Sequence, residues 1–434
     1  MDAKQIKKIT VEKLFGLYDY VLTIDPSNSD NVFILYGDNG AGKSTILKLT
    51  YHLLSSELGN GHKTYIANVP FKLFSVEFDD GTLVQAERED INQELTGTYT
   101  FIYKGDTDLS SKMPCEWNDV DHEYRIRFSI LNESNINDYR EITYKLRDIN
   151  IYYISDNRNE RQNEYPMDVR GRRPLHQIDP VEKEMDLLHD WIVSQALESS
   201  KKGEEGTSEI YAKILSKLSN TKASKENVVT LNYISQEIEK LEKRAKSYAK
   251  MGFLPETDYT KVREKLNKVR VINRTPAANI LMPYLEIQKN RLDALDYLFE
   301  TVDYLVESLN DYLYKKFVIY SVTTGFKFFQ KTNDFDKDLG MNIKNLIEIK
   351  KMSSGERQLL RLFSMVIRKS NVCPIIIIDE PEISLNIKWQ RRLLSTLNHF
   401  VRKSHAQFII ATHSFEIIAS HTENTVKVGE PYIP

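Results

Sequence analysis

The stretch Tyr36-Gly-Asp-Asn-Gly-Ala-Gly-Lys-Ser-Thr45 decides the fold that this sequence predicts. It matches the phosphate-binding pattern G-x-x-x-x-G-K-[ST], with Gly37, Gly42, Lys43 and Ser44 at the fixed positions. The apolar run before it has the length of a strand, and the apolar spacing after it is typical of a helix. A strand, a glycine-rich turn and a helix in this order predict a phosphate-binding loop in an α/β fold.

The residue types of this loop suit a nucleotide. Glycines allow successive backbone N–H groups to point at one anion, and the helix that follows adds its positive end. Lys43 adds a positive charge for the outer phosphates, and the Ser44 hydroxyl is a ligand for the Mg²⁺ that nucleotides carry. The alternative is a plain glycine-rich turn. We expect the cofactors ATP and Mg²⁺, bound by Gly37, Asn39, Gly40, Gly42, Lys43, Ser44 and Thr45.

The composition is that of an ordinary folded protein. Of the 434 residues, 41% are hydrophobic and 28% are charged, which excludes a disordered or fibrous chain. No apolar run approaches the length of a membrane span, and the first residues, MDAKQIKKIT, lack the apolar stretch of a secretory signal. Cys115 and Cys373 are too few for a disulfide framework or a zinc site. We expect a cytoplasmic protein with no membrane partner, and a net charge of −3 indicates no general affinity for nucleic acid.

Alternating apolar and polar residues on both sides of the loop predict antiparallel strands. They occur in residues 8–25 and again between 70 and 153, where Asp79-Asp80-Gly81 is a turn signal. We expect these strands to form a β-rich extension of the nucleotide-binding part. A short buried strand is predicted at 151–154, before the polar loop of residues 155–164.

Between about residues 180 and 318 the pattern changes to helix. Apolar residues in 231–248 are spaced 3, 4, 3, 4 and 3 apart, which predicts a short coiled-coil seam. Further helices are predicted at 262–269 and through 292–313. We interpret these helices as an insertion between two halves of one head. The predicted domains are an N-terminal head lobe at 1–165, a helical or coiled-coil insertion at 166–317 and a C-terminal head lobe at 318–434.

Two carboxylates follow an apolar strand near the other end of the chain. Ile375 to Ile378 predict a buried parallel strand, and ligands bind at the carboxyl ends of such strands, where Asp379 and Glu380 stand. We expect Asp379, together with Ser44, to hold Mg²⁺. We expect Glu380 to accept a proton from the water that attacks the γ-phosphate. A strand that ends in two acids is common, so this prediction depends on its pairing with the phosphate loop.

Further motifs complete an order that resembles a known family. Ser353-Ser-Gly-Glu-Arg-Gln358 precedes the acid pair, and Ser384-Leu385-Asn386 and then His413 follow it. In this order the sequence resembles the ABC-type ATPases, in the branch shared by the SMC-like and OLD-type (overcoming lysogenization defect) proteins. In the D-loop of this family, Asn386 stands where Asp or His is usual.

The resemblance implies an α/β fold: an ABC-ATPase head with a phosphate loop, a mixed sheet with an antiparallel extension, and an inserted helical domain. It also implies a homodimer in which two heads enclose two ATP molecules. In that dimer the signature motif of one chain, Ser353, Ser354, Gly355 and Glu356, would bind the ATP on the phosphate loop of the other. His413 would hold or sense the γ-phosphate and act in catalysis beside Glu380.

Several assignments stay open at this point. Ser353 and Glu356 also suit a helix N-cap, and His413 also suits a structural role after a strand. Arg158 and Arg161 suit either phosphate contacts or a solvated loop. The candidates for the family's Q-loop glutamine are Gln85, Gln93 and Gln162.

The layout favours an ATPase that acts through another protein. OLD-type proteins carry a Toprim nuclease domain after the ATPase, whereas only 21 residues follow His413, so we expect any nuclease on a separate chain. The layout resembles the ATPase subunits of two-component bacterial anti-phage defence systems, most like the PARIS system and next the Septu system. This implies an oligomeric sensor or scaffold that regulates a separate effector, a Toprim nuclease, and responds to a phage trigger protein.

A DNA-clamping, SMC-like ATPase of repair or recombination is the second hypothesis. Residues 201–275 carry 17 Lys and Arg against 10 Asp and Glu, and the net charge of +7 attracts acidic partners such as DNA. The same charges also suit the solvated surface of a helix. A steep dependence of DNA binding on salt would separate these interpretations.

Overall fold

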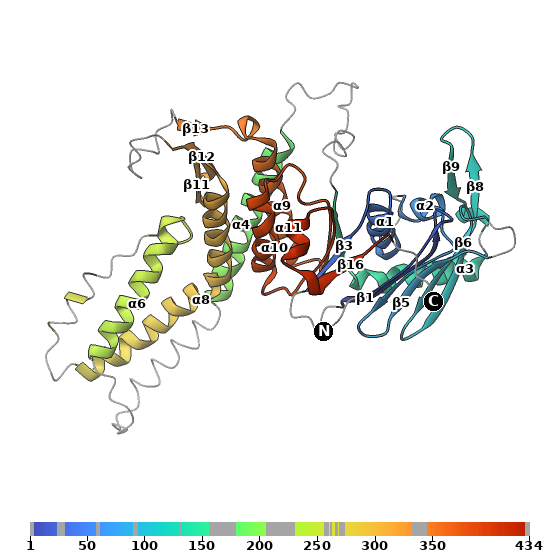
Figure 1. Cartoon of the computed structure of the whole chain (residues 1–434). Helices are drawn as coiled ribbons and strands as arrows, with labels where there is room; N and C mark the ends of the chain where they lie inside the picture. The colour runs from blue at the N-terminus through green and yellow to red at the C-terminus, as the bar shows by residue number, and fades with distance from the viewer. Residues whose placement is uncertain are drawn as a thin grey trace, which may run out of the picture. The chain divides into compact units, whose positions relative to one another are not determined.

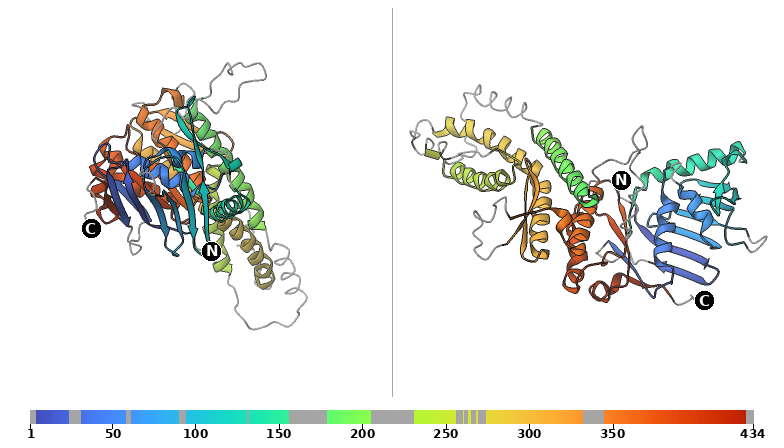
Figure 2. Two further views of the ribbon diagram at one scale, coloured as in Figure 1. Left: turned by 90° about the vertical axis from the view of Figure 1, so that its right-hand side faces the viewer. Right: turned by 90° about the horizontal axis from the view of Figure 1, so that it is seen from above.

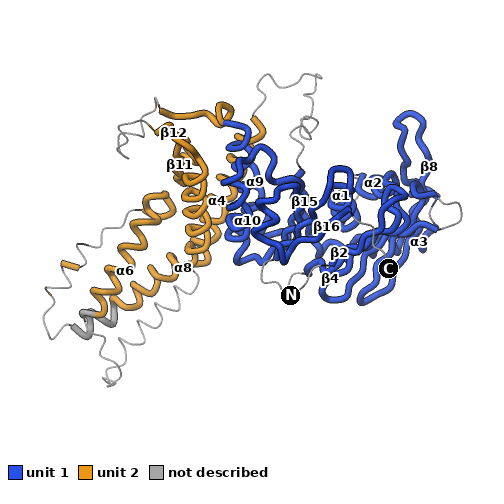
Figure 3. Tube along the Cα trace, in the orientation of Figure 1, with its two compact units in different colours: residues 1–177, 353–434 blue, residues 178–352 orange. Residues whose placement is uncertain are grey.

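The computed structural model divides into two compact units, which Figure 3 draws in blue and orange. Unit 1 comprises residues 1–177 and 353–434, and unit 2 comprises residues 178–352. The two ends of the chain therefore fold together. Across the described residues, no helix is both long enough and apolar enough to span a membrane. The structure describes residues 4–23, 31–57, 61–89, 94–130, 132–155, 179–204, 231–255, 260, 263–264, 268, 274–331 and 345–429.

The centre of unit 1 is a parallel sheet of five strands. Its strand order is β10, β14, β15, β3 and β16, and each strand runs parallel to its neighbours. The strands are β10 (Ile151–Ile154), β14 (Ile375–Asp379), β15 (Gln407–Thr412), β3 (Val32–Tyr36) and β16 (Thr425–Lys427). Every residue of β14 and β15 is buried, as is typical of a parallel sheet that is covered on both faces.

Different elements cover the two faces of this sheet. The helices of unit 1 are α1 (Lys43–Leu54), α2 (His62–Asn68), α3 (Glu133–Lys145), α9 (Ser354–Ser370), α10 (Ile387–Val401) and α11 (Phe415–Ala419). On one face, Phe33, Ile377 and Ile409 join a core that also contains α1. The alternate residues Ile376 and Ile410 are equally buried and point to the opposite face, because successive side chains of a strand alternate. α9 packs against β10 and β14. α10 packs against α9, and Figure 1 shows these two helices next to each other.

A second, antiparallel sheet of six strands completes the core on the α1 side. Its order is β2, β1, β4, β5, β6 and β7, and the left view of Figure 2 shows these strands side by side in blue to cyan. The strands are β1 (Ile6–Leu14), β2 (Tyr18–Thr23), β4 (Leu73–Phe78), β5 (Leu83–Glu87), β6 (Tyr99–Lys104) and β7 (Asp108–Met113), and a separate hairpin consists of β8 (Cys115–Asn118) and β9 (Glu123–Ile126). The predicted antiparallel extension is thus confirmed.

One helix in this region departs from the β-rich prediction. α3 begins after Asn132, whose side chain accepts a hydrogen bond from the Asn135 N–H at 2.9 Å. The 3-10 helices η1 (Phe128–Ile130) and η2 (Leu146–Asp148) flank it. Tyr139 and Ile142 are buried three residues apart, which is helix spacing inside a stretch dominated by strand signals.

The two ends of the chain are joined directly by one side chain. The Gln407 Oε1 accepts a hydrogen bond from the Ile6 N–H at 2.8 Å, and its Nε2 donates to the Ile6 carbonyl at 2.9 Å. Gln407 is the first residue of β15, and Ile6 is the first residue of β1. This buried pair connects the parallel sheet to the antiparallel sheet and satisfies both polar groups of the amide.

Unit 2 consists mainly of three helices and a small sheet. The helices are α4 (Pro180–Glu204), α6 (Leu231–Lys250) and α8 (Arg274–Tyr312), followed by β11 (Lys316–Ser321), β12 (Gly325–Gln330), β13 (Leu346–Ile347) and the 3-10 helix η5 (Ile349–Lys351). α8 packs against both α4 and α6. The predicted seam is buried along α6, at Ile234, Ile238, Leu241, Ala245 and Tyr248. The helix predicted at 262–269 lies mostly outside the described residues.

The boundary between the two units differs from the predicted lobes. The sequence analysis begins the C-terminal head lobe at residue 318, whereas the structure groups β11, β12 and β13 with unit 2. The reason is local, because β11 follows α8 directly, packs on it, and among the described residues pairs only with β12. Short alternating stretches in the sequence do not reveal which sheet they join. The functional domain bounds stay a prediction.

Candidate functional site

Three predicted motifs meet at one edge of the parallel sheet. β3 leads into the phosphate loop, β14 ends at Asp379, and β15 ends at Thr412 immediately before His413. In the sheet register, Thr412 lies beside Tyr36 and Asp379 lies beside Ala411, so the three carboxyl ends are level. This is the edge at which ligands bind in open parallel sheets.

The phosphate loop depends on its glycines for two different reasons. At Gly37 a Cβ atom would lie 1.8 Å from the Val428 carbonyl oxygen, so no other residue fits there. Gly40 and Gly42 have φ values of 86° and 89°, which is the left-handed region that glycine adopts without strain. Gly42 is also the N-cap of α1. Asn39 and Gly40 are exposed, and Thr45 is half-buried in the first turn of α1.

Lys43 lies at the centre of the site. Its Nζ donates to the carbonyl oxygens of Gly37 and Asp38, at 3.0 and 3.1 Å. The same Nζ lies 2.7 Å from the His413 Nε2, and this ring nitrogen lies 3.2 Å from the Glu380 Oε1. Burial lowers the pKa of Lys43, although the charges of Glu380 and Asp379 oppose that effect. Burial, and then the charge of Lys43, lower the pKa of His413.

Two hydroxyl groups surround the carboxylate of Asp379. The Ser44 hydroxyl donates to the Asp379 Oδ1 at 2.9 Å, and the Tyr153 hydroxyl donates to the Oδ2 at 3.0 Å. Mg²⁺ prefers oxygen ligands and is usually bound through one or two carboxylates together with substrate phosphates. The adjacent hydroxyl of Ser44 and carboxylate of Asp379 therefore fit the predicted metal ligands. Tyr153, on β10, is a partner of Asp379 that the sequence analysis does not identify.

Glu380 has an unusual backbone and an unusual carboxyl group. Its φ is 50°, a conformation that costs a non-glycine residue roughly 1–2 kcal/mol, and its N–H donates to the Ala411 carbonyl at 2.9 Å. Burial, then the neighbouring carboxyl group of Glu382, and then the charge of Asp379 raise the pKa of Glu380 to about 8, against the opposing effect of Lys43. Strain and a raised pKa in one residue are typical of functional sites.

Glu382 is a third carboxylate that the sequence analysis does not single out. It is 9% exposed, and its Oε1 accepts from the Thr412 hydroxyl at 2.6 Å and from the backbone N–H groups of His413 and Ser414, at 2.7 and 3.1 Å. Within the described part of the chain, its buried Oε2 has no hydrogen-bond partner. The available signal was the third acid of Asp379-Glu-Pro-Glu382, which lies three residues after the last residue of the strand.

One known family matches most of the sequence. The sequence model of the AAA ATPase domain family AAA_15 matches residues 5–418. The chain belongs to this family. No curated protein matches this ATPase. With the parallel sheet, the antiparallel extension and the inserted helices in place, the predicted α/β ATPase head is confirmed as the fold class.

Solved structures similar to this ATPase include two head domains. One is the Smc head domain with an extended coiled coil bound to the C-terminal domain of ScpA, derived from Pyrococcus furiosus, with 15% identity and a TM-score of 0.36, covering 96% of this chain and 92% of that chain. The other is the SmcHead bound to the C-winged helix domain of ScpA, with 11% identity and a TM-score of 0.34, covering 96% and 91%.

The residues predicted to form the signature motif lie at the start of α9. Ser353 is the N-cap, its Oγ accepts from the Glu356 N–H at 3.3 Å, and the Glu356 carboxylate accepts from the Ser353 N–H at 2.8 Å. This is a capping box, so the N-cap interpretation of the motif is structurally correct. At Gly355 a Cβ would lie 2.4 Å from the Ser384 carbonyl oxygen, which explains the glycine. Ser353 and Ser354 are exposed at the positive end of the helix.

The remaining sequence candidates lie elsewhere or outside the described residues. Gln85 is on β5 of the antiparallel sheet, where its Nε2 donates to the Glu87 carboxylate at 2.8 Å. Asn386 is the N-cap of α10, and its side chain accepts from the Trp389 N–H at 3.0 Å. The candidates outside the described residues are Gln93, Gln162, Arg158 and Arg161.

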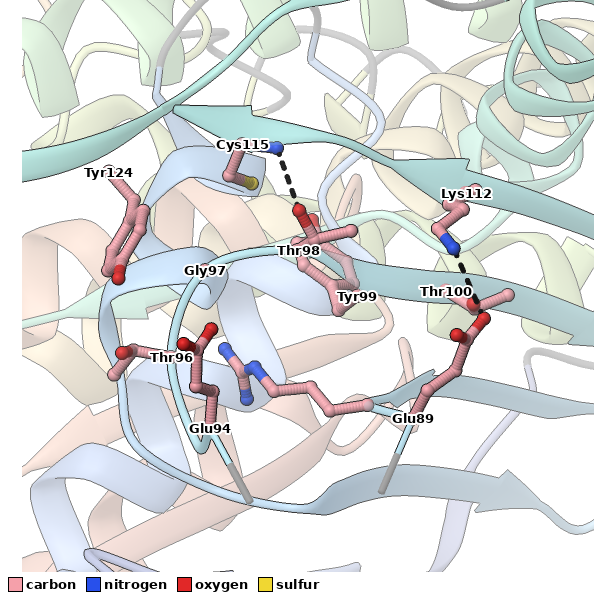
Figure 4. Close-up of a pocket in the computed structure, with 11 residues that line it drawn as sticks. Glu89, Glu94, Thr96, Gly97, Thr98, Tyr99, Thr100, Lys112, Cys115 and Tyr124 are labelled. Carbon is pink, nitrogen blue, oxygen red and sulfur yellow. Dashed lines mark hydrogen bonds and ion pairs between the residues drawn. The ribbon is translucent and has the colours of Figure 1, made fainter. Parts of the chain in front are cut away.

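A separate cavity of about 270 Å³ lies in the antiparallel part of unit 1 (Figure 4). Thr98, Tyr99, Cys115 and Tyr124 line it, and none of its lining residues belongs to the predicted site. The guanidinium group of Arg88, which also lines it, donates to the carbonyl oxygens of Phe71, Ile66 and Ala67. Two of these carbonyls lie in the last turn of α2, where a cation stabilises a helix end. Arg88 is therefore a structural cation.

Proposed function

We propose that this ATPase binds ATP and hydrolyses it to ADP and phosphate with the residues gathered at the edge of the parallel sheet. The observation that carries this proposal is the convergence of Lys43, Glu380 and His413 on one another, next to the Ser44 and Asp379 pair. A phosphate-binding loop, an acid with a raised pKa and a histidine at hydrogen-bond distance can together bind the phosphates and orient and deprotonate the attacking water.

Each side chain has a separate task in the proposed reaction. Lys43 and the loop N–H groups bind the outer phosphates, and His413 holds the γ-phosphate from the other side. Ser44 and Asp379 would hold Mg²⁺, which neutralises phosphate charge when it is bound. Glu380 orients the attacking water and accepts its proton. The raised pKa of Glu380 makes it a stronger base than an ordinary carboxylate.

In the proposed reaction, a second copy of the chain completes the ATP-binding site. Ser353 and Ser354 are exposed at the N-terminus of α9, where N–H groups and the helix dipole favour an anion. We assign to these residues, with Gly355 and Glu356, the binding of the γ-phosphate on the phosphate loop of a partner subunit. Glu356 contributes through the capping box, because its carboxylate is buried there and fixes the first turn.

For the biological role, the proposal is a cytoplasmic sensor or scaffold in anti-phage defence. The ATPase would form higher oligomers and hold a separate effector, a Toprim nuclease, until a phage protein triggers release. The motif order and the compact unit 2 inserted between the two parts of unit 1 support this role. The test is co-expression with the neighbouring genes, followed by purification with ATP. If the protein neither oligomerises nor retains a neighbouring gene product, the sensor role is wrong.

The DNA-clamping alternative has one observation in its favour. The basic stretch 201–275 keeps its net charge of +7, although most of it lies outside the described residues. DNA binding through this stretch would weaken steeply with salt, because each phosphate contact releases counterions. An affinity for duplex DNA that is absent, or that does not change with salt, would remove this alternative.

The biochemical proposal is tested by an ATP hydrolysis assay on the purified full-length chain with Mg²⁺. Phosphate release that saturates with ATP and that Lys43→Ala abolishes supports it. Tight ATP binding without phosphate release would leave a nucleotide-binding protein and contradict the proposed reaction.

A further inference from the structure

Glu382 connects the acid pair to the segment that carries His413. It follows Glu380 after Pro381, and its Oε1 accepts hydrogen bonds from three consecutive residues, Thr412, His413 and Ser414. One oxygen atom thus receives a hydroxyl donor and two backbone donors at 2.6, 2.7 and 3.1 Å. Hydrogen bonds to a carboxylate oxygen are charge-assisted and are stronger than those between neutral groups.

Glu382 holds residues 412–414, and the position of this segment sets the position of His413 in the proposed active site. Thr412 is the last residue of β15 and is fully buried, and His413 follows it at the edge of the sheet. The His413 Nε2 reaches Lys43 at 2.7 Å and Glu380 at 3.2 Å. Distances of this size change with small shifts of the backbone, and a 1 Å misplacement of a reacting group can cost about 100-fold in rate.

We propose that Glu382 is a positioning residue of the ATPase, which fixes the backbone of residues 412–414 and thereby aims His413 at Lys43 and Glu380. The inference rests on the proposed hydrolysis of ATP and adds to it a residue that couples the strand carrying the acids to the strand carrying the histidine. Glu382 acts through His413 and does not itself touch the phosphates.

The contacts of Glu382 argue against a role as the general base. Its Oε1 is occupied by three donors, whereas the Glu380 Oε1 lies beside His413. The Oε2 of Glu382 is buried, and the neighbouring carboxyl group of Glu382 raises the pKa of Glu380. Glu382 therefore contacts the backbone at His413 through one oxygen and lies next to Glu380.

Two substitutions separate positioning from chemistry. Glu382→Ala removes the acceptor and leaves buried donors without it, whereas Glu382→Gln keeps an acceptor oxygen of the same reach and removes the negative charge. A positioning role predicts that Gln rescues what Ala loses. Glu416→Ala is the matched control, because Glu416 belongs to the nearby helix α11 and pairs with Arg391 on the surface.

The first readout is hydrogen–deuterium exchange of the full-length protein, on peptides that cover residues 407–418. In Glu382→Ala the amides of His413 and Ser414 should exchange about 10- to 100-fold faster, as expected from the loss of a hydrogen bond to a charged group. In Glu382→Gln, which keeps neutral hydrogen bonds, the exchange rate should lie clearly below that of Glu382→Ala, and in Glu416→Ala it should be close to the wild-type rate. Unchanged exchange in Glu382→Ala would overturn the proposal, and this readout does not depend on hydrolysis.

The second readout is the steady-state hydrolysis of ATP together with the Kd of a fluorescent ATP analogue. We expect Glu382→Ala to lower kcat about 10- to 100-fold and to leave the Kd within about threefold. Glu382→Gln should keep most of the activity. If Gln loses as much as Ala, the charge of Glu382 takes part in the reaction and the positioning role is wrong. If the wild-type protein releases no phosphate, the proposed function is wrong. The hydrogen–deuterium exchange result then still shows whether Glu382 fixes the backbone of residues 412–414.

A third variant protects the test if Glu382→Ala does not fold. Thr412→Val removes the hydroxyl donor at 2.6 Å and keeps the shape of the side chain. Its effect should be smaller than that of Glu382→Ala but of the same kind, with a lower kcat and an unchanged Kd. A wild-type kcat in Thr412→Val, together with wild-type exchange at His413, would count against the proposal.

Discussion

The Nζ of Lys43 lies 2.7 Å from the Nε2 of His413, although 370 positions separate the two residues in the sequence. The contact arises because β3 and β15 are neighbouring parallel strands whose carboxyl ends are level. It joins the first and last motifs of the chain into one site.

Lys43→Ala should weaken nucleotide binding by about 10-fold or more. The phosphates lose their main side-chain cation, and hydrogen bonds to charged groups of this kind contribute about 1.5–3 kcal/mol each, which corresponds to about 10- to 100-fold in Kd. Titration with a fluorescent ATP analogue measures the change. Lys48→Ala, in the same helix, is the control and should bind as the wild type does. An unchanged Kd in Lys43→Ala would contradict the role of the loop.

Glu380→Gln should keep ATP bound and slow its hydrolysis. The amide cannot accept the proton of the attacking water, and general-base catalysis contributes about 100- to 10,000-fold. Phosphate release and nucleotide affinity, measured on the same preparation, test this. A loss of affinity as large as that of Lys43→Ala would show that Glu380 serves binding and not the reaction.

The stability of the protein should depend on pH through Glu380. The folded-state pKa of about 8 is higher than the ordinary value of 4.5, so the folded protein holds this proton more tightly than the unfolded chain. The unfolding free energy therefore falls as pH rises between about 4.5 and about 8, by at least about 1 kcal/mol. Gln imitates the protonated acid, so Glu380→Gln should raise the Tm more at about pH 9 than at about pH 5.

The control for this pH effect is Glu416→Gln. An ion pair with Arg391 lowers the pKa of Glu416, so its contribution to stability has the opposite sign and is screened by solvent. As pH rises, the Tm of Glu416→Gln should therefore not increase relative to the Tm of the wild type. A Tm difference for Glu380→Gln that is the same at both pH values would contradict the raised pKa.

Tyr153→Phe should weaken the response to Mg²⁺ without weakening ATP binding itself. The Tyr153 hydroxyl holds the Asp379 Oδ2, and the loss of such a supporting partner typically lowers metal affinity about 10-fold or more. Phe keeps the ring that stacks on Tyr51, at 5.5 Å between centroids. The measurement is the Mg²⁺ concentration that gives half of the maximal thermal stabilisation by an ATP analogue. No shift in that concentration would show that Tyr153 is a packing residue only.

Ser354→Arg should prevent ATP-dependent dimerisation and leave ATP binding to each monomer intact. Ser354 is exposed in the first turn of α9, so a large cation there would block the proposed approach of the partner's phosphate loop. Light scattering of the Glu380→Gln protein with ATP reports the mass, with and without the substitution. Ser395→Arg, on an exposed site of α10, is the control. A dimer that survives Ser354→Arg would rule out this face as the interface.

The sequence predicts the parts of the site that are encoded locally. A phosphate loop needs glycines, a lysine and a hydroxyl at fixed spacing, so Gly37, Lys43 and Ser44 can be located without a structure. The acids after β14 and the histidine after β15 follow from a general rule, because parallel strands gather their carboxyl ends at one edge.

Other parts of the site depend on contacts that no local pattern encodes. Tyr153 meets Asp379 across 226 positions, and Glu382 meets His413 across 31, each through a side chain whose direction only the folded sheet decides. The strands β11 to β13 show the same limit for the fold. Their grouping with unit 2 depends on the packing of β11 against α8, which no local pattern encodes.

The most direct test of the account is a structure of Glu380→Gln determined with ATP and Mg²⁺. The γ-phosphate is expected between Lys43 and His413, the metal on Ser44 and Asp379, and Ser354 of the partner subunit on the opposite side of the nucleotide. Nucleotide bound away from Lys43, or bound there with no second copy over it, would contradict the account.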